Sequence, residues 1–164
     1  MKRTAVALGV LFAIDLGLIG QGIFSLLIAF GGTALLGLGA LWAVVRGQRR
    51  VAGGKAARAA IYFLLGAATV GALFFHSYTA RTRATRVIEA SRVYKAKHGR
   101  LPERLQDLVP ECLPSVPRAK YAYLLGEFTY WASPGGTHTL VYVTMPPFSR
   151  RLYHFEEDRW STLD

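Results

Sequence analysis

The stretch EASRVYKAKHGRLPERLQDLVPECLPSVP, residues 89–117, decides how this chain is organised. It begins with charged and small side chains in a helical pattern, and then reaches Gly99. Glycine commonly ends a helix in a left-handed conformation, and proline prevents a helix from continuing. We therefore expect a long helix to end at Gly99 and a short helix at 103–109 to cover it. Pro110, Pro114 and Pro117 should then force an extended path.

Upstream of this stretch the sequence is strongly apolar. Only Asp15, Gln21 and a few hydroxyl residues interrupt the run 4–45. The run 59–80 carries no formal charge unless His76 is protonated. A bilayer crossing needs about 20 apolar residues, so the first run has room for two crossings and the second for one. We expect a membrane domain at 1–80, with three transmembrane helices at about 4–20, 23–45 and 59–80, and a separate domain at 81–164.

Downstream of Pro117 the pattern changes to short alternating segments. Strands are predicted at 121–131, 138–145 and 151–155, with a turn at 133–136 and a closing Trp160. Because nothing interrupts the helical pattern of 59–98, one helix should run from the membrane to Gly99. The predicted fold is α+β, in which this long helix packs on an antiparallel sheet of three or four strands.

Charge predicts the orientation of the membrane helices. Basic residues without any acid fill the expected loop 46–58, namely Arg46, Arg49, Arg50, Lys55 and Arg58. Such loops lie on the cytoplasmic side, where they attract anionic phospholipid headgroups. The C-terminal domain is then expected on the periplasmic side of a bacterial inner membrane. Further basic residues after the third crossing leave the reverse orientation open: Arg81, Arg83, Arg86, Arg92, Lys95, Lys97 and Arg100.

Small residues at a spacing of four predict faces on which membrane helices pack closely. The first crossing carries Ala5, Gly9, Ala13 and Gly17. The other ladders are Ser25, Ala29, Thr33 and Gly37 in the second crossing, and Ala67 with Gly71 and Ala68 with Ala72 in the third. We predict that Gly9, Ala13 and Gly17, together with Asp15, serve helix packing and the docking of other integral membrane subunits.

Asp15 is costly inside a membrane, by about 2.5 to 3.5 kcal/mol on insertion scales. At 100° per residue it points away from the first ladder, towards Leu8 and Phe12. One face of this helix is therefore expected to meet its own bundle and the other a second protein. Three roles remain open for Asp15. It is a packing residue, protonated or bonded to Gln21, Ser25 or Thr33; a docking residue; or part of a transport path.

Cofactor, catalytic and nucleic-acid roles find little support. His76 is typical of an interfacial residue beside aromatic side chains, although an imidazole there could be an axial ligand of a tetrapyrrole. The sequence contains no H-E-x-x-H, G-x-S-x-G, C-x-x-C or dinucleotide motif. Cys112, the single cysteine, would act as a nucleophile only beside His98, His138 or His154, and it is interpreted as a small buried apolar group. We expect no cofactor and no enzymatic activity.

The net charge of +10 does not point to nucleic acid. Seven basic residues precede residue 59 and serve topology, which leaves 13 basic against nine acidic residues in the domain 81–164. Much of that surplus lies on the helix nearest the membrane, where phospholipid is the closest anion. Nucleic acid is therefore not expected as a partner.

The segment YKAKHGRLPERLQDLVP, residues 94–110, follows a membrane-emergent helix and precedes a small meander. In this it resembles the type IV pilin-like fold, closest to the pseudopilins of type II secretion systems, over residues 59–155. Pilins begin with a processing site, a Gly before Phe with a Glu four residues later, and residues 58–63 contain neither that Gly nor that Glu. Two additional crossings precede the helix. The resemblance therefore implies the shape of the extracytoplasmic domain, but not filament building.

The resemblance also draws attention to Glu156, Glu157 and Asp158, because pseudopilins can bind calcium in a loop among their strands. A calcium ion takes 6 to 8 oxygen ligands from a defined loop, and three consecutive acids are more typical of a solvated turn. No metal is expected here.

Together these observations predict a non-catalytic structural or accessory subunit of a bacterial inner-membrane protein complex, which presents a periplasmic domain to its partners. The alternative is an envelope binding module of secretion or pilus machinery, with the pilin-like domain as its receptor part.

Overall fold

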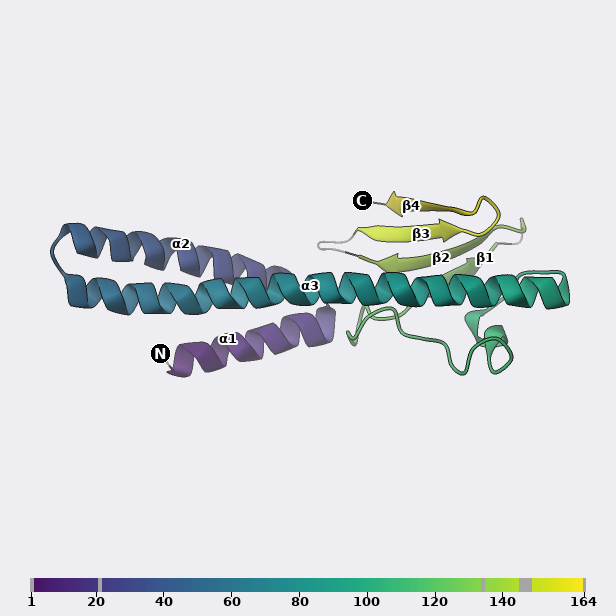
Figure 1. The fold of residues 1–164 in the computed structure, drawn as a ribbon, viewed down its shortest axis with the longest axis horizontal. Coiled ribbons are helices and arrows are strands. Elements are labelled where there is room, and N and C mark those ends of the chain that lie inside the picture. Colours follow the sequence, from purple (N-terminus) through teal and green to yellow (C-terminus); the bar gives the residue numbers. More distant parts are fainter. Residues whose placement is uncertain (1, 21, 134, 145–148, 164) are drawn as a thin grey trace. The chain divides into compact units, whose positions relative to one another are not determined.

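The computed structural model describes residues 2–20, 22–133, 135–144 and 149–163 (Figure 1). It contains two compact units, residues 1–74 and 75–164, here called the N-terminal and C-terminal units. The helix α3 (Arg49–His98) begins in the first unit and ends in the second. The predicted uninterrupted helix up to residue 98 is therefore present, and it starts earlier than expected.

The N-terminal unit is helical throughout. The helix α1 (Lys2–Ile14) passes into a short π-helix, η1 (Asp15–Ile19), which ends where Gly20 adopts a left-handed φ of 75°. The helix α2 (Ile23–Val45) follows. By length and composition α2 and α3 are able to cross a membrane, whereas the expected crossing at 4–20 is divided between α1 and η1.

The expected loop 46–58 is much shorter in the structure. Gly47 turns the chain with a φ of 71°, and α3 already begins at Arg49. Two glycines inside the expected loop, Gly53 and Gly54, do not break the helix. Glycine in a helix costs only about 1 kcal/mol relative to alanine, which the helix-favouring alanines around it offset.

Small residues form the seam between α2 and the first part of α3. The buried positions are Ser25, Ala29, Ala40 and Ala43 on α2, and Ala52, Ala59, Thr69 and Leu73 on α3. Their spacings of 4, 11 and 3 residues on α2 and of 7, 10 and 4 on α3 are sums of three- and four-residue steps, which keeps them on one face of each helix. The predicted ladder of equal four-residue steps leaves this face. Four residues turn the helix by about 400°, so each step moves the side chain about 40° further around the helix axis. Thr33 is consequently half-buried and Gly37 exposed, and Ala67 and Gly71 lie exposed on the opposite side of α3.

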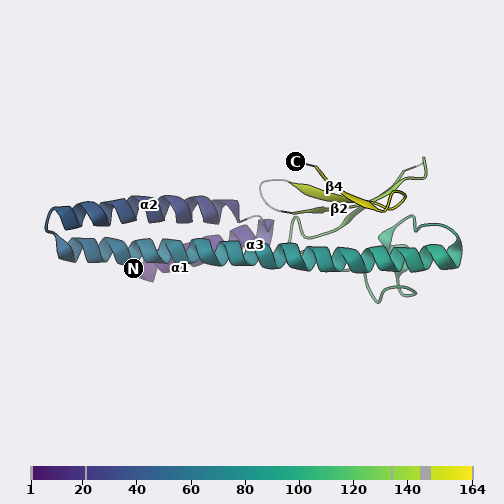
Figure 2. The ribbon, with the colours of Figure 1, turned by 45° about the horizontal axis from the view of Figure 1, so that its top comes forward.

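In the C-terminal unit the end of α3 packs against a sheet, and both views place that sheet along one side of the helix (Figures 1 and 2). Gly99 ends α3 as predicted, with a φ of 74° and its N–H donating to Lys95 O at 2.8 Å. The short helix expected at 103–109 is a single 3-10 turn, η2 (Leu105–Leu108), because Arg104 and Val109 are both extended. The core joins helix, turn and sheet: Ala80, Ala84, Val87, Ile88, Ala90, Leu105, Leu108, Ala119, Leu140, Tyr142 and Tyr153.

The sheet contains β1 (Thr129–Ala132), β2 (His138–Val143), β3 (Arg150–His154) and β4 (Arg159–Leu163), antiparallel in the order β1-β2-β3-β4. Leu140 pairs with Tyr130 and Tyr153, and Tyr153 pairs with Trp160. Of these cross-strand partners, Leu140 and Tyr153 belong to the core, and Tyr130 and Trp160 pack against it. The predicted α+β fold, a long helix on an antiparallel sheet, is confirmed with four strands.

The first strand begins later than the predicted residue 121. The Lys120 N–H donates to Gly126 O at 3.0 Å and closes a loop. The Arg118 guanidinium donates to Ala122 O at 2.9 Å and to Tyr123 O at 3.1 Å. These local hydrogen bonds hold backbone groups that a strand ladder would otherwise use, so β1 starts only after the loop.

At the other end of the sheet, Trp160 belongs to a complete strand, β4, where only a closing aromatic residue was expected. Met145, the predicted end of the second strand, and Pro134, in the predicted turn, lie outside the described residues.

Candidate functional site

Asp15 caps the N-terminus of α2 from η1. Its side chain is buried, and its Oδ2 accepts the backbone N–H of Ser25, in the first turn of α2, at 2.7 Å. The capping position of α2 is Gly22, which has no side chain to accept that N–H. A carboxylate at this position also stabilises the positive end of the helix dipole. Of the three roles left open for Asp15, the structure contains the hydrogen bond of a packing residue, which Asp15 accepts from the Ser25 backbone. Gln21, another expected partner, lies outside the described residues.

The other members of the predicted docking set lie on the opposite face. Gly9, Ala13 and Gly17 are exposed, whereas Leu8 and Leu16 are buried on the side of Asp15. A Cβ at Gly9 or Gly17 would meet no described atom within 4 Å. The helix is thus two-sided, with its carboxylate inside the unit and its small residues open to an external surface.

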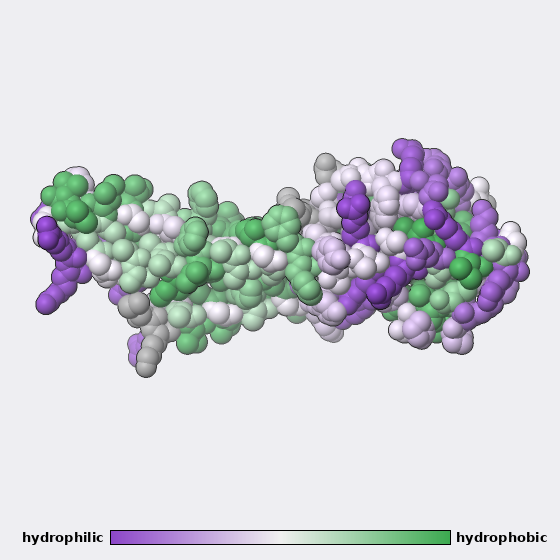
Figure 3. Space-filling model, viewed as in Figure 1, coloured by the Kyte–Doolittle hydropathy of each residue, from purple (hydrophilic) through white to green (hydrophobic). Residues whose placement is uncertain are grey.

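The surface of the N-terminal unit is dominated by apolar side chains. Figure 3 shows a largely hydrophobic face over α2 and the first part of α3, with hydrophilic atoms gathered where these two helices connect. Phe30 is 83% exposed and Leu35 is 75% exposed. In the most apolar 18-residue stretch of each helix, only 11% of the residues of α2 and 17% of those of α3 are buried. Continuous exposed apolar surfaces are typical of sites that contact a membrane or another protein.

The predicted headgroup-binding residues lie around the connection between α2 and α3. The Arg46 guanidinium stacks over the Trp42 ring at 4.8 Å, and Lys55 Nζ donates to Gly39 O at 3.4 Å. Arg49, Arg50 and Arg58 are exposed on the first turns of α3. Three cations are therefore open to an anionic partner, and the other two also hold local structure.

His76 is 9% exposed and lies beside Phe75, with the two ring centroids 6.3 Å apart. Within the described part of the chain its Nδ1 has no hydrogen-bond partner. An axial ligand must face an open space large enough for a macrocycle, and this imidazole is packed against protein.

The three consecutive acids of the β3–β4 turn have three different partners. Glu156 accepts from His138 N at 2.9 Å and contacts His138 Nδ1 at 2.7 Å. Asp158 pairs with Arg92 at 2.6 Å, and Glu157 pairs with its neighbour Arg159. Among the described residues no group of three or more His, Cys, Asp or Glu side chains is placed to hold a metal ion.

In the part of the chain that the structure describes, Cys112 and the three candidate histidines have separate partners. Cys112 is half-buried and packs against the core. His98 Nε2 contacts Glu111 at 3.1 Å, and His138 contacts Glu156. His154 Nε2 lies 2.8 Å from Ser161 Oγ, which joins two strands of the sheet.

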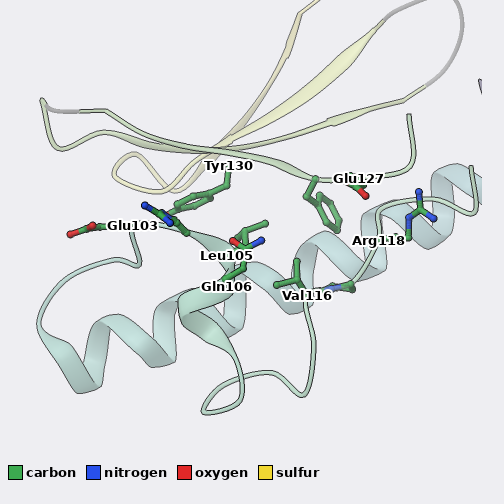
Figure 4. A pocket seen from close by; sticks show the side chains of 10 residues that line it. Glu103, Leu105, Gln106, Val116, Arg118, Glu127 and Tyr130 are labelled. Atoms are coloured by element: carbon green, nitrogen blue, oxygen red, sulfur yellow. The ribbon is translucent and has the colours of Figure 1, made fainter. Parts of the chain in front are cut away.

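A cavity of 330 Å³ opens beside η2 in the C-terminal unit. Figure 4 shows Glu127 and Tyr130 on one wall of it, with Gln106 and Val116 opposite. Tyr130 OH donates to Pro102 O at 2.8 Å. Burial, together with nearby carboxylates, raises the pKa of Tyr130, so its phenol remains a donor. The lining also includes Glu103, Arg104 and Arg118, so carboxylates and guanidinium groups surround the opening.

Lys120, which no sequence pattern marked, is only 1% exposed. Its Nζ donates to Thr144 O at 2.7 Å. Burial lowers the pKa of Lys120 to about 8. Lys120 precedes a tyrosine in a segment that alternates apolar and small residues, and a lysine in such a position is usually solvated. Lys120 is unusual because its ammonium group reaches Thr144 O, immediately after the end of β2, instead of solvent.

Comparisons with family models, with curated proteins and with solved structures found no match.

Proposed function

We propose that this protein is a non-catalytic accessory subunit of a bacterial inner-membrane complex. It is anchored by three apolar segments, at about 4–20, 23–45 and 59–80, and it presents the C-terminal unit on the periplasmic side. The observation that carries the proposal is the two-sided first helix. Asp15 faces inwards and caps α2, while Gly9, Ala13 and Gly17 face outwards. In hydrocarbon such a small-residue face favours close approach of another helix.

The partners of the basic residues that follow residue 80 support the proposed orientation. Arg83 donates to Arg118 O at 2.8 Å, and Arg92 pairs with Asp158 at 2.6 Å. Lys97 pairs with Glu111 at 3.0 Å, and Arg100 pairs with Glu103 at 3.1 Å. These four cations have roles inside the C-terminal unit, so their presence does not require that unit to be cytoplasmic.

The arrangement of the C-terminal unit supports a pilin-like shape. A long helix that enters from an apolar segment packs on a four-stranded antiparallel meander. The proposal extends to shape alone, because the sequence has no pilin processing site. A subunit held by additional membrane segments serves better as a fixed component than as an extruded filament subunit.

Purification from the native host in mild detergent tests the proposal. The wild-type chain should elute with stoichiometric integral membrane subunits. Gly9→Leu places a bulky side chain on the exposed face of α1 and should lose those subunits, while the chain itself should not be destabilised, because a Cβ there meets no described atom within 4 Å and leucine favours a helix more than glycine does. Val10→Leu, at a neighbouring position that is 55% exposed, is the matched control and should keep them. A complex unaffected by Gly9→Leu would overturn the proposed docking face.

C-terminal reporter fusions test the orientation separately. An alkaline phosphatase fusion should be active and a green fluorescent protein fusion dark, because only the former functions in the periplasm. The opposite pair of results would place the C-terminal unit in the cytoplasm.

The cavity beside η2 favours one alternative, an envelope binding module that recognises a small polar ligand or a peptide end. Its 330 Å³ lies at the lower end of the volumes typical of ligand sites. Elution of the wild-type chain as a monomer or homo-oligomer, without other subunits, would favour this alternative over the accessory subunit.

A further inference from the structure

We infer that the loop 118–126 of the C-terminal unit lies in the phospholipid headgroup region of the bilayer, on the side where α3 leaves it. The occupant of this surface is thus lipid rather than protein. The inference rests on the proposed function in one respect, since it requires α3 to cross the membrane at 59–80.

The loop is held against the part of α3 where the apolar segment ends. The Tyr121 ring stacks on the Phe75 ring, with centroids 6.2 Å apart and planes 11° from parallel. Phe75 precedes the end of the apolar segment by five residues, or about 7.5 Å along the helix axis. The Arg83 guanidinium also lies over the Tyr121 ring, 4.2 Å from its centroid. Arg83 follows the end of that segment by about 4.5 Å.

The exposed side chains of the loop suit this depth. Tyr121 is 59% exposed, Tyr123 is 72% exposed and Leu124 is 60% exposed. In water these apolar groups would form an unfavourable patch. Tyrosine concentrates at the membrane–water boundary, because its ring enters the acyl region while its hydroxyl stays hydrated.

Arginines complete the chemistry and fix the shape of the loop. Arg118 holds the Ala122 and Tyr123 carbonyls, and Arg83 holds Arg118 O and the Tyr121 hydroxyl. The loop is therefore ordered before it meets lipid, which lowers the entropy cost of insertion. Guanidinium groups at this level can contact phosphate while their aliphatic stems cover apolar surface. Anionic and zwitterionic phospholipids share that phosphate chemistry.

Site-directed spin labelling of the full chain in phospholipid nanodiscs tests the inference. In a Cys112→Ser background, Leu124→Cys carries a nitroxide, and collisions with oxygen and with a water-soluble nickel complex are measured. Val93→Cys, an exposed apolar site farther along α3, is the matched control. Leu64→Cys, within the apolar segment, reports whether α3 spans the bilayer.

Nickel-complex broadening should be clearly weaker at Leu124 than at Val93, and oxygen collisions stronger, with both values intermediate between those at Val93 and those at Leu64. Broadening at Leu124 equal to that at Val93, with Leu64 in lipid, would overturn the inference and leave membrane anchoring intact. Loss of both types of collision at Leu124 would also overturn it, because a protein surface would then cover the loop. Broadening at Leu64 would refute the anchoring itself.

Discussion

Lys120 offers the most direct quantitative test of how the C-terminal unit is held together. The ammonium group is almost completely buried and donates to Thr144 O, and burial lowers its pKa from 10.5 to about 8. A shift of this size means that the charged form is less stable in the folded protein than in water by about 3 kcal/mol. We expect replacement by methionine, which has a similar length and no charge, to remove that cost.

The sign of the effect with pH follows from the two pKa values. Below pH 8 the folded and unfolded chains both bind the proton, and the folded state bears the whole cost. Between pH 8 and 10.5 the unfolded chain still binds the proton while the folded chain releases it. The wild-type protein should therefore become more stable relative to Lys120→Met as pH rises, by up to about 3 kcal/mol.

At pH 7.5 the variant loses the hydrogen bond to Thr144 O as well as the buried charge. An unsatisfied buried carbonyl costs about 1 to 3 kcal/mol. Lys120→Met should thus be more stable than the wild type by about 0 to 2 kcal/mol at pH 7.5, and less stable near pH 10.5.

The assay is denaturant unfolding of the full chain in detergent, from pH 7.5 to 10.5. Fluorescence is read in a Trp42→Phe background, so that Trp131 and Trp160 report the C-terminal unit. Lys95→Met, at an exposed position, controls for the loss of one positive charge. A difference between wild type and Lys120→Met that does not change with pH would refute the burial argument.

Three further predictions concern other contacts. Asp15→Ala should lower the free energy of unfolding by about 0.5 to 2 kcal/mol through loss of the α2 cap, and Asp15→Asn, which keeps an accepting oxygen, should lose less; thermal unfolding in detergent measures both. Gly32→Val should destabilise the α2–α3 seam by about 1 to 3 kcal/mol, because a Cβ there lies within 2.6 Å of Tyr62 ring atoms; Gly37→Val, where a Cβ meets no described atom, should not. For Glu156, burial raises the pKa but hydrogen bonds from the His138 backbone and ring outweigh it and lower the pKa below 4.5. The wild type should therefore lose stability relative to Glu156→Gln as pH falls below 4.5, and unchanged relative stability in an acid titration followed by fluorescence would contradict this.

Local sequence patterns predicted several elements well. Gly99 was expected to end the long helix because a left-handed residue there costs glycine little, and the structure has a φ of 74° at that position. Ala84, Val87 and Ile88 stand at helical spacing in the sequence of α3, and the core buries all three. The four-residue ladder of α2 failed beyond Ala29 because equal steps drift around a helix, whereas the seam needs steps of three and four.

The predicted start of the first strand was wrong for a different reason. The alternation from Tyr121 onwards suggests a strand, but Arg118 binds two carbonyls of that segment and converts it into a loop. The same fold buries Lys120, which no local pattern marks. The loop is closed by groups four and five residues apart, which compete with the strand pattern, whereas the burial of Lys120 depends on Thr144 O, which lies 24 residues away in the chain.

The sequence by itself determined which segments are apolar, where the long helix stops and that an α+β unit follows, because these properties depend on composition and on neighbours within a few residues. Tertiary structure decided that Asp15 caps α2 while the glycines of its helix face outwards, that the loop after Pro117 lies beside the end of the apolar segment, and that Lys120 is buried. These depend on contacts between residues distant in the chain, whose energies are set by geometry and burial rather than by local pattern.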